Sequence, residues 1–166
     1  LDSLIDRGVL FRRAYTAPVC SPTRAMILSG RFPRQTGIGT AINVLEGTMT
    51  LDPDRTSIAD LAGLSRANYA RIALGKWHLG VVSETGTLTH PQEVGFDVHL
   101  GPPGNLMGHA FDGLEQTYFD YEKVVDGVIE RSAVYATTDI VDDAIALISE
   151  RTEPWLLYVA FNAPHG

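Results

Sequence analysis

Long hydrophobic runs, disulfide-forming cysteines and internal repeats are what this sequence of 166 residues lacks. No apolar stretch approaches the roughly 20 residues that cross a bilayer, so no membrane span is expected. Cys20 is the single cysteine, so no internal disulfide can form and cysteine usage indicates no redox compartment. Without repeats or low-complexity tracts, a solenoid or a long disordered linker is not indicated either.

A secretory signal is also missing, because residues 1–9 carry acidic side chains among the apolar ones. The first residue is Leu1 rather than methionine, and Gly166 directly follows a Pro-His pair that belongs to a motif described below. We therefore expect a piece of a longer protein, truncated at both ends, whose compartment the missing signal does not define.

Charge is distributed unevenly along the chain, whose net charge is −7. Residues 1–80 contain ten basic and six acidic side chains, whereas residues 81–166 contain three basic and fourteen acidic ones. The second half therefore fits a solvated acidic surface, and the first half is where an anion site is expected. No basic cluster is dense enough to follow a nucleic-acid backbone, so no nucleic-acid partner is expected.

The content of 45% hydrophobic and 20% charged residues is typical of one globular domain with a buried core. Hydrophobic patterns predict helices at residues 1–8, 21–30, 56–64 and 138–150 and strands at residues 9–15, 69–74, 121–129 (as a hairpin) and 155–161. This alternation predicts an α/β fold with a mostly parallel central sheet flanked by helices, and the last strand is expected to be buried and central.

Helix caps and loops complete this interpretation. Ser21 is expected to cap the second helix, Thr56 or Ser57 the third, and Thr138 or Asp139 the last. Residues 31–55 and 83–120 are rich in glycine and proline; the first are expected to be a loop, and the second loops with short elements. The second loop contains three histidines, expected at the surface rather than as ligands, with the alternative that one of them lines the substrate cleft: His90, His99 and His109.

Cys20, Pro22 and Arg24 stand at the start of the predicted helix 21–30. A helix N-terminus favours anions, and Arg24 lies one turn beyond Cys20 and can lean back toward it. This arrangement places a nucleophile beside a cation. The alternative is that Cys20 is a small buried apolar residue and Arg24 a surface charge.

Three further polar residues follow predicted strands. Lys76 and His78 come directly after the strand at residues 69–74, and His165 follows the strand at residues 155–161. Open α/β sheets bind ligands beyond the carboxyl ends of their strands, where lysine can bind an oxyanion and histidine can exchange protons. The alternative is a solvated lysine, structural histidines and Trp77 in the core.

Three segments resemble the sulfatase family, in the family's order and approximate spacing. APVCSPTRAMILSGRFPRQTG (residues 17–37) and NYARIALGKWHLG (residues 68–80) are similar to its two signatures. EPWLLYVAFNAPHG (residues 153–166) is similar to a later strand that ends in a Pro-His motif. With GFD at residues 95–97 and the helix at 138–150, the resemblance covers nearly the whole chain. It implies a partial catalytic domain, residues 1–166, with an alkaline-phosphatase-like core.

The resemblance implies that Cys20 is oxidised to formylglycine by a maturation enzyme. One hydroxyl of the hydrated aldehyde would attack the sulfur of a sulfate ester, and the second would be deprotonated to expel sulfate. By position, Arg24 would hold the diol, Lys76 would bind a sulfate oxygen and His78 would position the diol or take its proton. His165 would bind sulfate or assist the leaving oxygen. A calcium ion would bind the modified residue 20.

The sequence departs from the family pattern in two ways. The other metal ligands and a further lysine would lie outside residues 1–166, so we expect the isolated chain to be inactive. Within the second signature, Asn68 stands where glycine is common and Arg71 where threonine is common; neither change affects a matched catalytic position.

Three alternatives and several properties stay open. The same motifs fit a phosphonate or phosphate ester hydrolase of this superfamily, or a non-catalytic truncated homologue, and a plain α/β binding module with chance motifs is the third reading. Aryl sulfates, sulfated glycans and sulfated steroids are all candidate substrates, with selectivity expected from residues 38–55 and 83–120. The resemblance implies a periplasmic, secreted or lysosomal protein.

Overall fold

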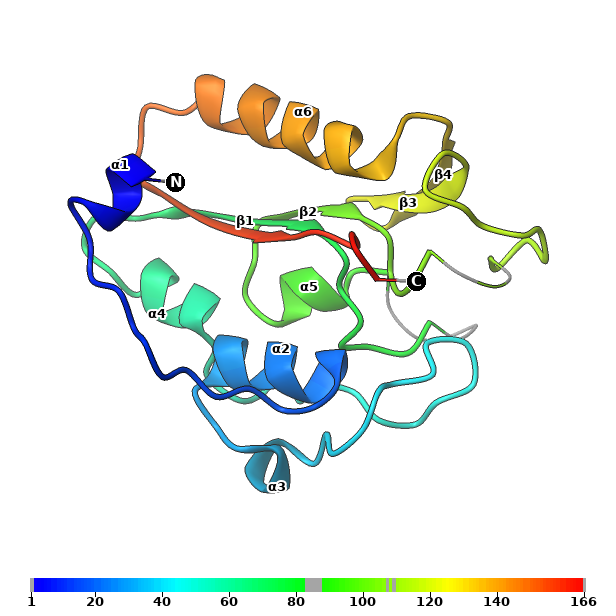
Figure 1. Cartoon of the computed structure of the whole chain (residues 1–166), viewed down its shortest axis with the longest axis horizontal. Coiled ribbons are helices and arrows are strands. Elements are labelled where there is room, and N and C mark those ends of the chain that lie inside the picture. The colour runs from blue at the N-terminus through cyan, green and yellow to red at the C-terminus, as the bar shows by residue number, and fades with distance from the viewer. Residues whose placement is uncertain (1, 83–87, 107, 109, 166) are drawn as a thin grey trace.

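A computed structural model describes residues 2–82, 88–106, 108 and 110–165 (Figure 1). The helices are α1 (Asp2–Ile5), α2 (Cys20–Ser29), α3 (Pro33–Thr36), α4 (Ile58–Gly63), α5 (His90–Glu93) and α6 (Ala136–Ser149). The strands are β1 (Ala70–Gly75), β2 (Val98–Gly101), β3 (Tyr121–Val125), β4 (Val128–Ser132) and β5 (Trp155–Ala160). Among the described residues, no helix has the length and apolar character needed to cross a membrane.

The strands form one five-stranded sheet in the order β4-β3-β2-β1-β5. β1 pairs in parallel with both of its neighbours, and Ile72 lies opposite Val98 of β2 and Leu157 of β5. β3 and β4 extend the sheet beyond β2 as the predicted antiparallel hairpin, which turns at Asp126 and Gly127. The predicted α/β class, with its parallel strands and flanking helices, is therefore confirmed.

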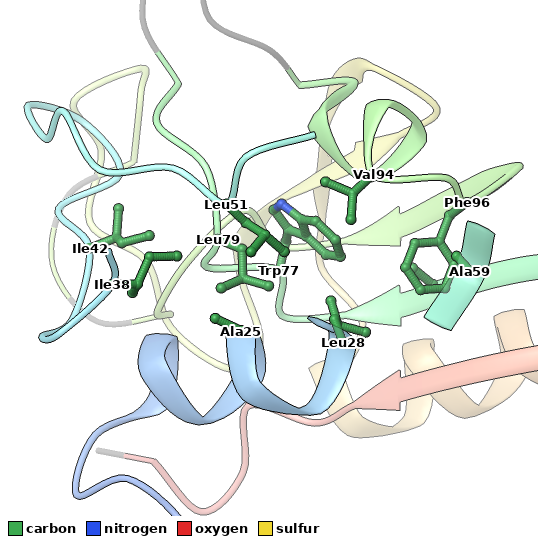
Figure 2. Packing of buried hydrophobic residues seen from close by; sticks show 11 residues of the cluster. Ala25, Leu28, Ile38, Ile42, Leu51, Ala59, Trp77, Leu79, Val94 and Phe96 are labelled. Atoms are coloured by element: carbon green, nitrogen blue, oxygen red, sulfur yellow. The ribbon is translucent and has the colours of Figure 1, made fainter. Parts of the chain in front are cut away.

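Helices cover both faces of this sheet (Figure 1). α6 covers one face, where Ile140 packs against Ile72 and Leu74 of β1. α2, α4 and α5 lie on the opposite face, and there Leu28 of α2 belongs to a cluster that surrounds Trp77 (Figure 2). Trp77 is thus in the core, while the residues on either side of it, as shown below, serve the candidate site.

Two histidines expected at the surface are buried instead. His90 is 3% exposed; its Nδ1 accepts a 2.8 Å hydrogen bond from the Trp77 indole, and its Nε2 lies 2.8 Å from the carbonyl oxygen of Leu51. His99 is 2% exposed, with Nε2 3.4 Å from the carbonyl oxygen of Gly75. The expectation was wrong because these rings satisfy buried polar groups. His109 lies outside the described residues.

Two expectations about strands were also wrong. Residues 9–15 are irregular and exposed, because none of the described strands pairs with them. β5 runs parallel to β1 as expected, but it lies at the edge of the described sheet and most of it is only partly buried. The four-residue strand β2 agrees with the short elements expected among the loops of residues 83–120.

Helix caps differ from the prediction at two of three positions. Val19 rather than Ser21 precedes α2, and Tyr135 rather than Thr138 or Asp139 precedes α6. The Ser21 hydroxyl is buried and accepts a 3.1 Å hydrogen bond from the Ile42 backbone instead. The expected cap by Ser57 is confirmed, since its hydroxyl accepts from the backbone of Ala59 and Asp60 in α4.

Candidate active site

The carboxyl ends of β1 and β5 bring two sequence motifs to the same edge of the sheet, because these strands are parallel. The Lys76 backbone donates a 2.8 Å hydrogen bond to the Ala160 carbonyl at the end of β5. Gly75 makes this approach possible: its φ is 82°, and a Cβ atom there would lie 2.3 Å from the Ala160 oxygen. Lys76 and His165 thus leave neighbouring strands at the edge where α/β sheets bind ligands.

The first turn of α2 carries Cys20 to this edge. The Thr23 hydroxyl lies 3.0 Å from the carbonyl oxygens of Ala17 and Val19 and closes the turn before the helix. Gly30 ends α2 in a left-handed conformation, as predicted. Cys20 is half-buried, so its sulfur is neither in an apolar core nor free in solvent.

His78 makes the closest side-chain contact with Cys20. Its Nδ1 lies 3.2 Å from the Cys20 sulfur, and its Nε2 lies 2.7 Å from the Ile42 carbonyl oxygen. Since a carbonyl can only accept, Nε2 carries the hydrogen and Nδ1 presents a lone pair to residue 20. Burial, followed by the positive charge of Lys76, lowers the pKa of His78 to about 4. The ring is therefore a neutral base at pH 7.

The backbone of His78 has the left-handed conformation that few non-glycine residues adopt. Its φ is 56°, and its N–H donates a 2.8 Å hydrogen bond to the Pro103 carbonyl. This turn breaks the extended path that was expected for Lys76 to His78. Both side chains nevertheless lie near Cys20, because the turn directs the His78 ring back to it.

Lys76 is a buried cation, 2% exposed. Its ammonium donates a hydrogen bond to the side-chain oxygen of Asn105. Burial lowers the pKa of Lys76, the neighbouring Cys20 opposes this change, and the Arg24 guanidinium adds to it. The ammonium thus lies close enough to residue 20 for the two groups to influence each other electrostatically.

Arg24 links α2 to both strands of the edge. Its Nη1 donates hydrogen bonds to the Lys76 carbonyl at 2.6 Å and to the Tyr158 hydroxyl at 3.3 Å. Its Nε is buried and has no hydrogen-bond partner within the described part of the chain. A buried, unpaired donor one turn after Cys20 fits a site that receives further oxygen atoms.

His165 lies across a pocket of about 580 Å³ that Cys20, Arg24, Asn105 and Tyr158 also line. His165 is exposed, and its backbone is held at both ends: its N–H donates to the Asn162 carbonyl at 2.9 Å, and its carbonyl accepts from the Tyr118 hydroxyl at 2.7 Å. All five residues singled out in the sequence therefore meet around one pocket or contact a residue that lines it.

Sequence reasoning missed the loop that supports these residues. Consecutive carbonyls of this loop accept hydrogen bonds from the motif segments: Pro102 from the Trp77 backbone at 3.0 Å, Pro103 from His78, and Gly104 from the Asn162 side chain at 3.1 Å. The next residue is Asn105, which binds Lys76. No motif marks this loop, and its Gly-Pro composition predicts a turn but no contact.

A metal site is not formed by the described residues alone. They contain no group of three or more His, Cys, Asp or Glu side chains that could hold a metal ion. The residues present therefore do not fit a complete calcium site, and only position 20 was expected to supply a ligand.

Comparison with known proteins finds sulfatases, in agreement with the resemblance seen in the sequence. A family model described as Sulfatase matches residues 1–166. N-acetylgalactosamine-6-sulfatase of Sus scrofa is 37% identical over 189 residues, covering 100% of this chain and 34% of that protein. An uncharacterised sulfatase of Escherichia coli (strain K12), YdeN, is 27% identical over 188 residues, covering 99% of this chain and 31% of that protein.

Solved structures of other proteins share the fold of this chain. The crystal structure of Ps i-CgsB has a TM-score of 0.72 and 27% identity, covering 92% of this chain and 36% of that one. The structure of BT4656 with its substrate D-glucosamine-2-N,6-O-disulfate has a TM-score of 0.68 and 28% identity, covering 99% of this chain and 29% of that one. The chain spans about a third of the length of these relatives. On the match along its whole length, the chain belongs to the sulfatase family.

Proposed function

We propose that the protein containing this chain is a sulfuric ester hydrolase of the arylsulfatase type, with a formylglycine made from Cys20 as its nucleophile. The main observation behind this proposal is the 3.2 Å contact between the Cys20 sulfur and the unprotonated Nδ1 of His78. Hydrated formylglycine supplies one hydroxyl to attack sulfur and a second whose deprotonation expels sulfate. Position 20 fits this group because a base, a buried ammonium and a guanidinium surround it.

His78 acts as the base in this proposal. Its Nδ1 faces residue 20, and the Ile42 carbonyl fixes the tautomer that leaves this nitrogen free to take a proton. With a pKa of about 4, the ring stays neutral at pH 7 and so keeps its lone pair. Low basicity favours rapid return of the proton rather than strong proton capture.

Lys76 and Arg24 stabilise negative charge that develops on the sulfate oxygens and on residue 20. Both cations are held by protein acceptors before any ligand binds, Lys76 by Asn105 and Arg24 by the Lys76 carbonyl. Such preorganised charges are more effective in a partly desolvated site than in water. His165, on the open side of the pocket, binds a sulfate oxygen or protonates the leaving oxygen.

Calcium and maturation complete the proposal. Residue 20 would contribute to a calcium site whose other ligands come from outside residues 1–166, and we assign no step to the ion. A formylglycine-generating enzyme is the maturation partner. The relative named N-acetylgalactosamine-6-sulfatase and the structure in complex with D-glucosamine-2-N,6-O-disulfate support a sulfated glycan as the substrate class.

Turnover by the full-length protein tests this proposal. An aryl sulfate should be hydrolysed, and Cys20→Ser should lower kcat by about a thousandfold because serine lacks the second hydroxyl needed to release sulfate. Unchanged thermal unfolding of the variant would show that its fold is intact. Phosphonate and phosphate monoesters should be measured beside the sulfate, since faster turnover of either would favour the phosphorus-ester hydrolase instead.

A further inference from the structure

His165 differs from the other four motif residues in how its side chain is held. The side chains of those four each make a hydrogen bond or a close polar contact within the protein. The His165 imidazole is exposed, and no described residue forms a hydrogen bond with it. The direction of this ring therefore depends on the backbone turn that follows β5, and a shift of that turn would move the ring relative to the pocket at Cys20.

Two side chains hold this turn to the rest of the molecule. The Asn162 side chain, at the start of the turn, donates a 3.1 Å hydrogen bond to the Gly104 carbonyl. At its end, the Tyr118 hydroxyl donates a 2.7 Å hydrogen bond to the His165 carbonyl. Tyr118 stands 47 residues before His165 and outside the three motif segments, so it joins the acidic second half of the chain to the site.

Tyr118 is itself fixed by its backbone and by its ring. Its carbonyl accepts a 2.8 Å hydrogen bond from the Ala136 N–H at the start of α6. Its ring packs against a buried cluster that includes Leu106, and its centroid lies 6.1 Å from that of the Tyr135 ring. A donor that is fixed in this way can restrain its acceptor, because it loses little freedom when the hydrogen bond forms.

We infer that Tyr118 is a positioning residue for His165: its hydroxyl fixes the turn after β5, so that the imidazole stays directed at the pocket. Catalytic groups must be held closely in place, since a displacement of about 1 Å can cost a large part of the rate. Tyr118 does not line the pocket at Cys20, so it acts through His165 and not on the substrate. This inference rests on the proposed sulfatase function and adds a residue to its machinery.

Tyr118→Phe in the full-length protein tests the inference, because it removes the hydroxyl and keeps the ring that packs on Leu106. The kcat/KM for an aryl sulfate is measured for this substitution alone and in a protein that also carries His165→Ala. The two backgrounds form a double-mutant cycle, which isolates the coupling between residues 118 and 165. Tyr135→Phe is the matched control, since it removes a hydroxyl from the neighbouring ring that forms no hydrogen bond with the described residues.

Tyr118→Phe should lower kcat/KM about fivefold where His165 is present, the usual effect of one lost hydrogen bond, and should have no effect where residue 165 is alanine. The control should change neither background. An equal loss in both backgrounds would show a general structural effect instead. That result, or no loss in either background, would overturn the inference and leave the sulfatase proposal standing.

NMR of histidines labelled at Cε1 provides a readout that needs no turnover. The His165 resonance, assigned by its absence in His165→Ala, should shift or broaden in Tyr118→Phe and stay unchanged in Tyr135→Phe, because only the first substitution frees the turn. An unchanged resonance in Tyr118→Phe would overturn the inference. A wild-type protein that hydrolyses no sulfate ester would remove the proposed function, and the resonance would still decide whether Tyr118 holds His165.

Discussion

At the scale of single residues, three features of His78 fix its tautomer, its charge and the direction of its ring. The Ile42 carbonyl fixes its tautomer, burial keeps it neutral, and its left-handed backbone directs the ring to residue 20. Left-handed conformations of non-glycine residues cost free energy and concentrate at functional sites. The conformation is therefore consistent with a ring that is held for a proton transfer.

The titration of His78 follows from its burial. Its pKa of about 4 lies below the value of 6.5 for an unperturbed histidine. As pH falls from 6.5 toward 4, His78 takes up a proton in the unfolded chain but not in the folded protein. Proton uptake by the unfolded chain alone lowers the free energy of unfolding, so the protein is less stable near pH 4 than above pH 6.5. We expect the Cε1 resonance of His78 in an NMR titration to change near pH 4, and the free energy of unfolding to fall over this interval. A midpoint near 6.5 would contradict the burial described here.

Asn105 is expected to position Lys76. Asn105→Ala removes an acceptor from a buried ammonium, so the pKa of Lys76 should fall and the basic limb of the kcat/KM profile should move to lower pH. Activity should fall about tenfold or more, since hydrogen bonds to charged groups are strong. Asn105→Asp keeps the oxygen and adds a negative charge, so it should move the same limb to higher pH. A basic limb that neither substitution moves would show that Asn105 does not act through Lys76.

At the scale of secondary-structure elements, an ionic cluster joins α6 to the hairpin. Lys123 of β3 lies 2.8 Å from Asp139 and 2.6 Å from Asp143, both on α6. The Tyr121 and Ser132 hydroxyls donate to the same Asp139 carboxylate, at 2.6 Å and 2.8 Å. The Lys123 side chain is only 11% exposed, so the two carboxylates depend on it for compensation.

Lys123→Met should destabilise the protein by about 3 kcal/mol, because it leaves two largely buried carboxylates without their cation. Chemical denaturation measures this loss. The triple variant Lys123→Met, Asp139→Asn, Asp143→Asn should recover a large part of it, since it removes the uncompensated charges. A loss below about 0.5 kcal/mol would mean that solvent screens the cluster as it does a surface ion pair.

Elements with strong local signals were predictable. The apolar run of β5, the strand before Gly75, the Asp126-Gly127 hairpin and the helix that Gly30 ends all form close to their expected bounds. β2 has four residues with no clear alternation, and its place beside β1 depends on pairing that no local pattern encodes. The caps of α2 and α6 failed for a similar reason: Ser21 is occupied by the distant Ile42 backbone, and Asp139 by the hairpin.

For the molecule as a whole, the site depends on three distant segments meeting at one edge of the sheet. Motifs identified Cys20, Arg24, Lys76, His78 and His165, because these residue types carry recognisable chemistry. The residues that support them were not singled out: Asn105 lies outside the three motif segments, and Tyr158 and Asn162 lie inside the third one without a predicted role. Their roles arise from tertiary contacts, which follow from the fold and not from spacing along the chain.

The isolated chain of 166 residues is still predicted to be inactive. Its described residues include no group of three or more side chains that could hold a metal ion, and its relatives are about three times as long. Aryl sulfate turnover by the excised chain would contradict this prediction. The full-length protein is therefore the form in which the nucleophile should be examined.

Mass spectrometry of the peptide that contains Cys20, isolated from full-length protein made with its maturation enzyme, tests the central claim most directly. The account predicts an aldehyde, so the peptide should have the mass of the thiol peptide with its sulfur and two hydrogens replaced by one oxygen. Reaction of this peptide with a hydrazine should confirm the aldehyde. An unmodified thiol at position 20 in protein that hydrolyses sulfate esters would contradict the account.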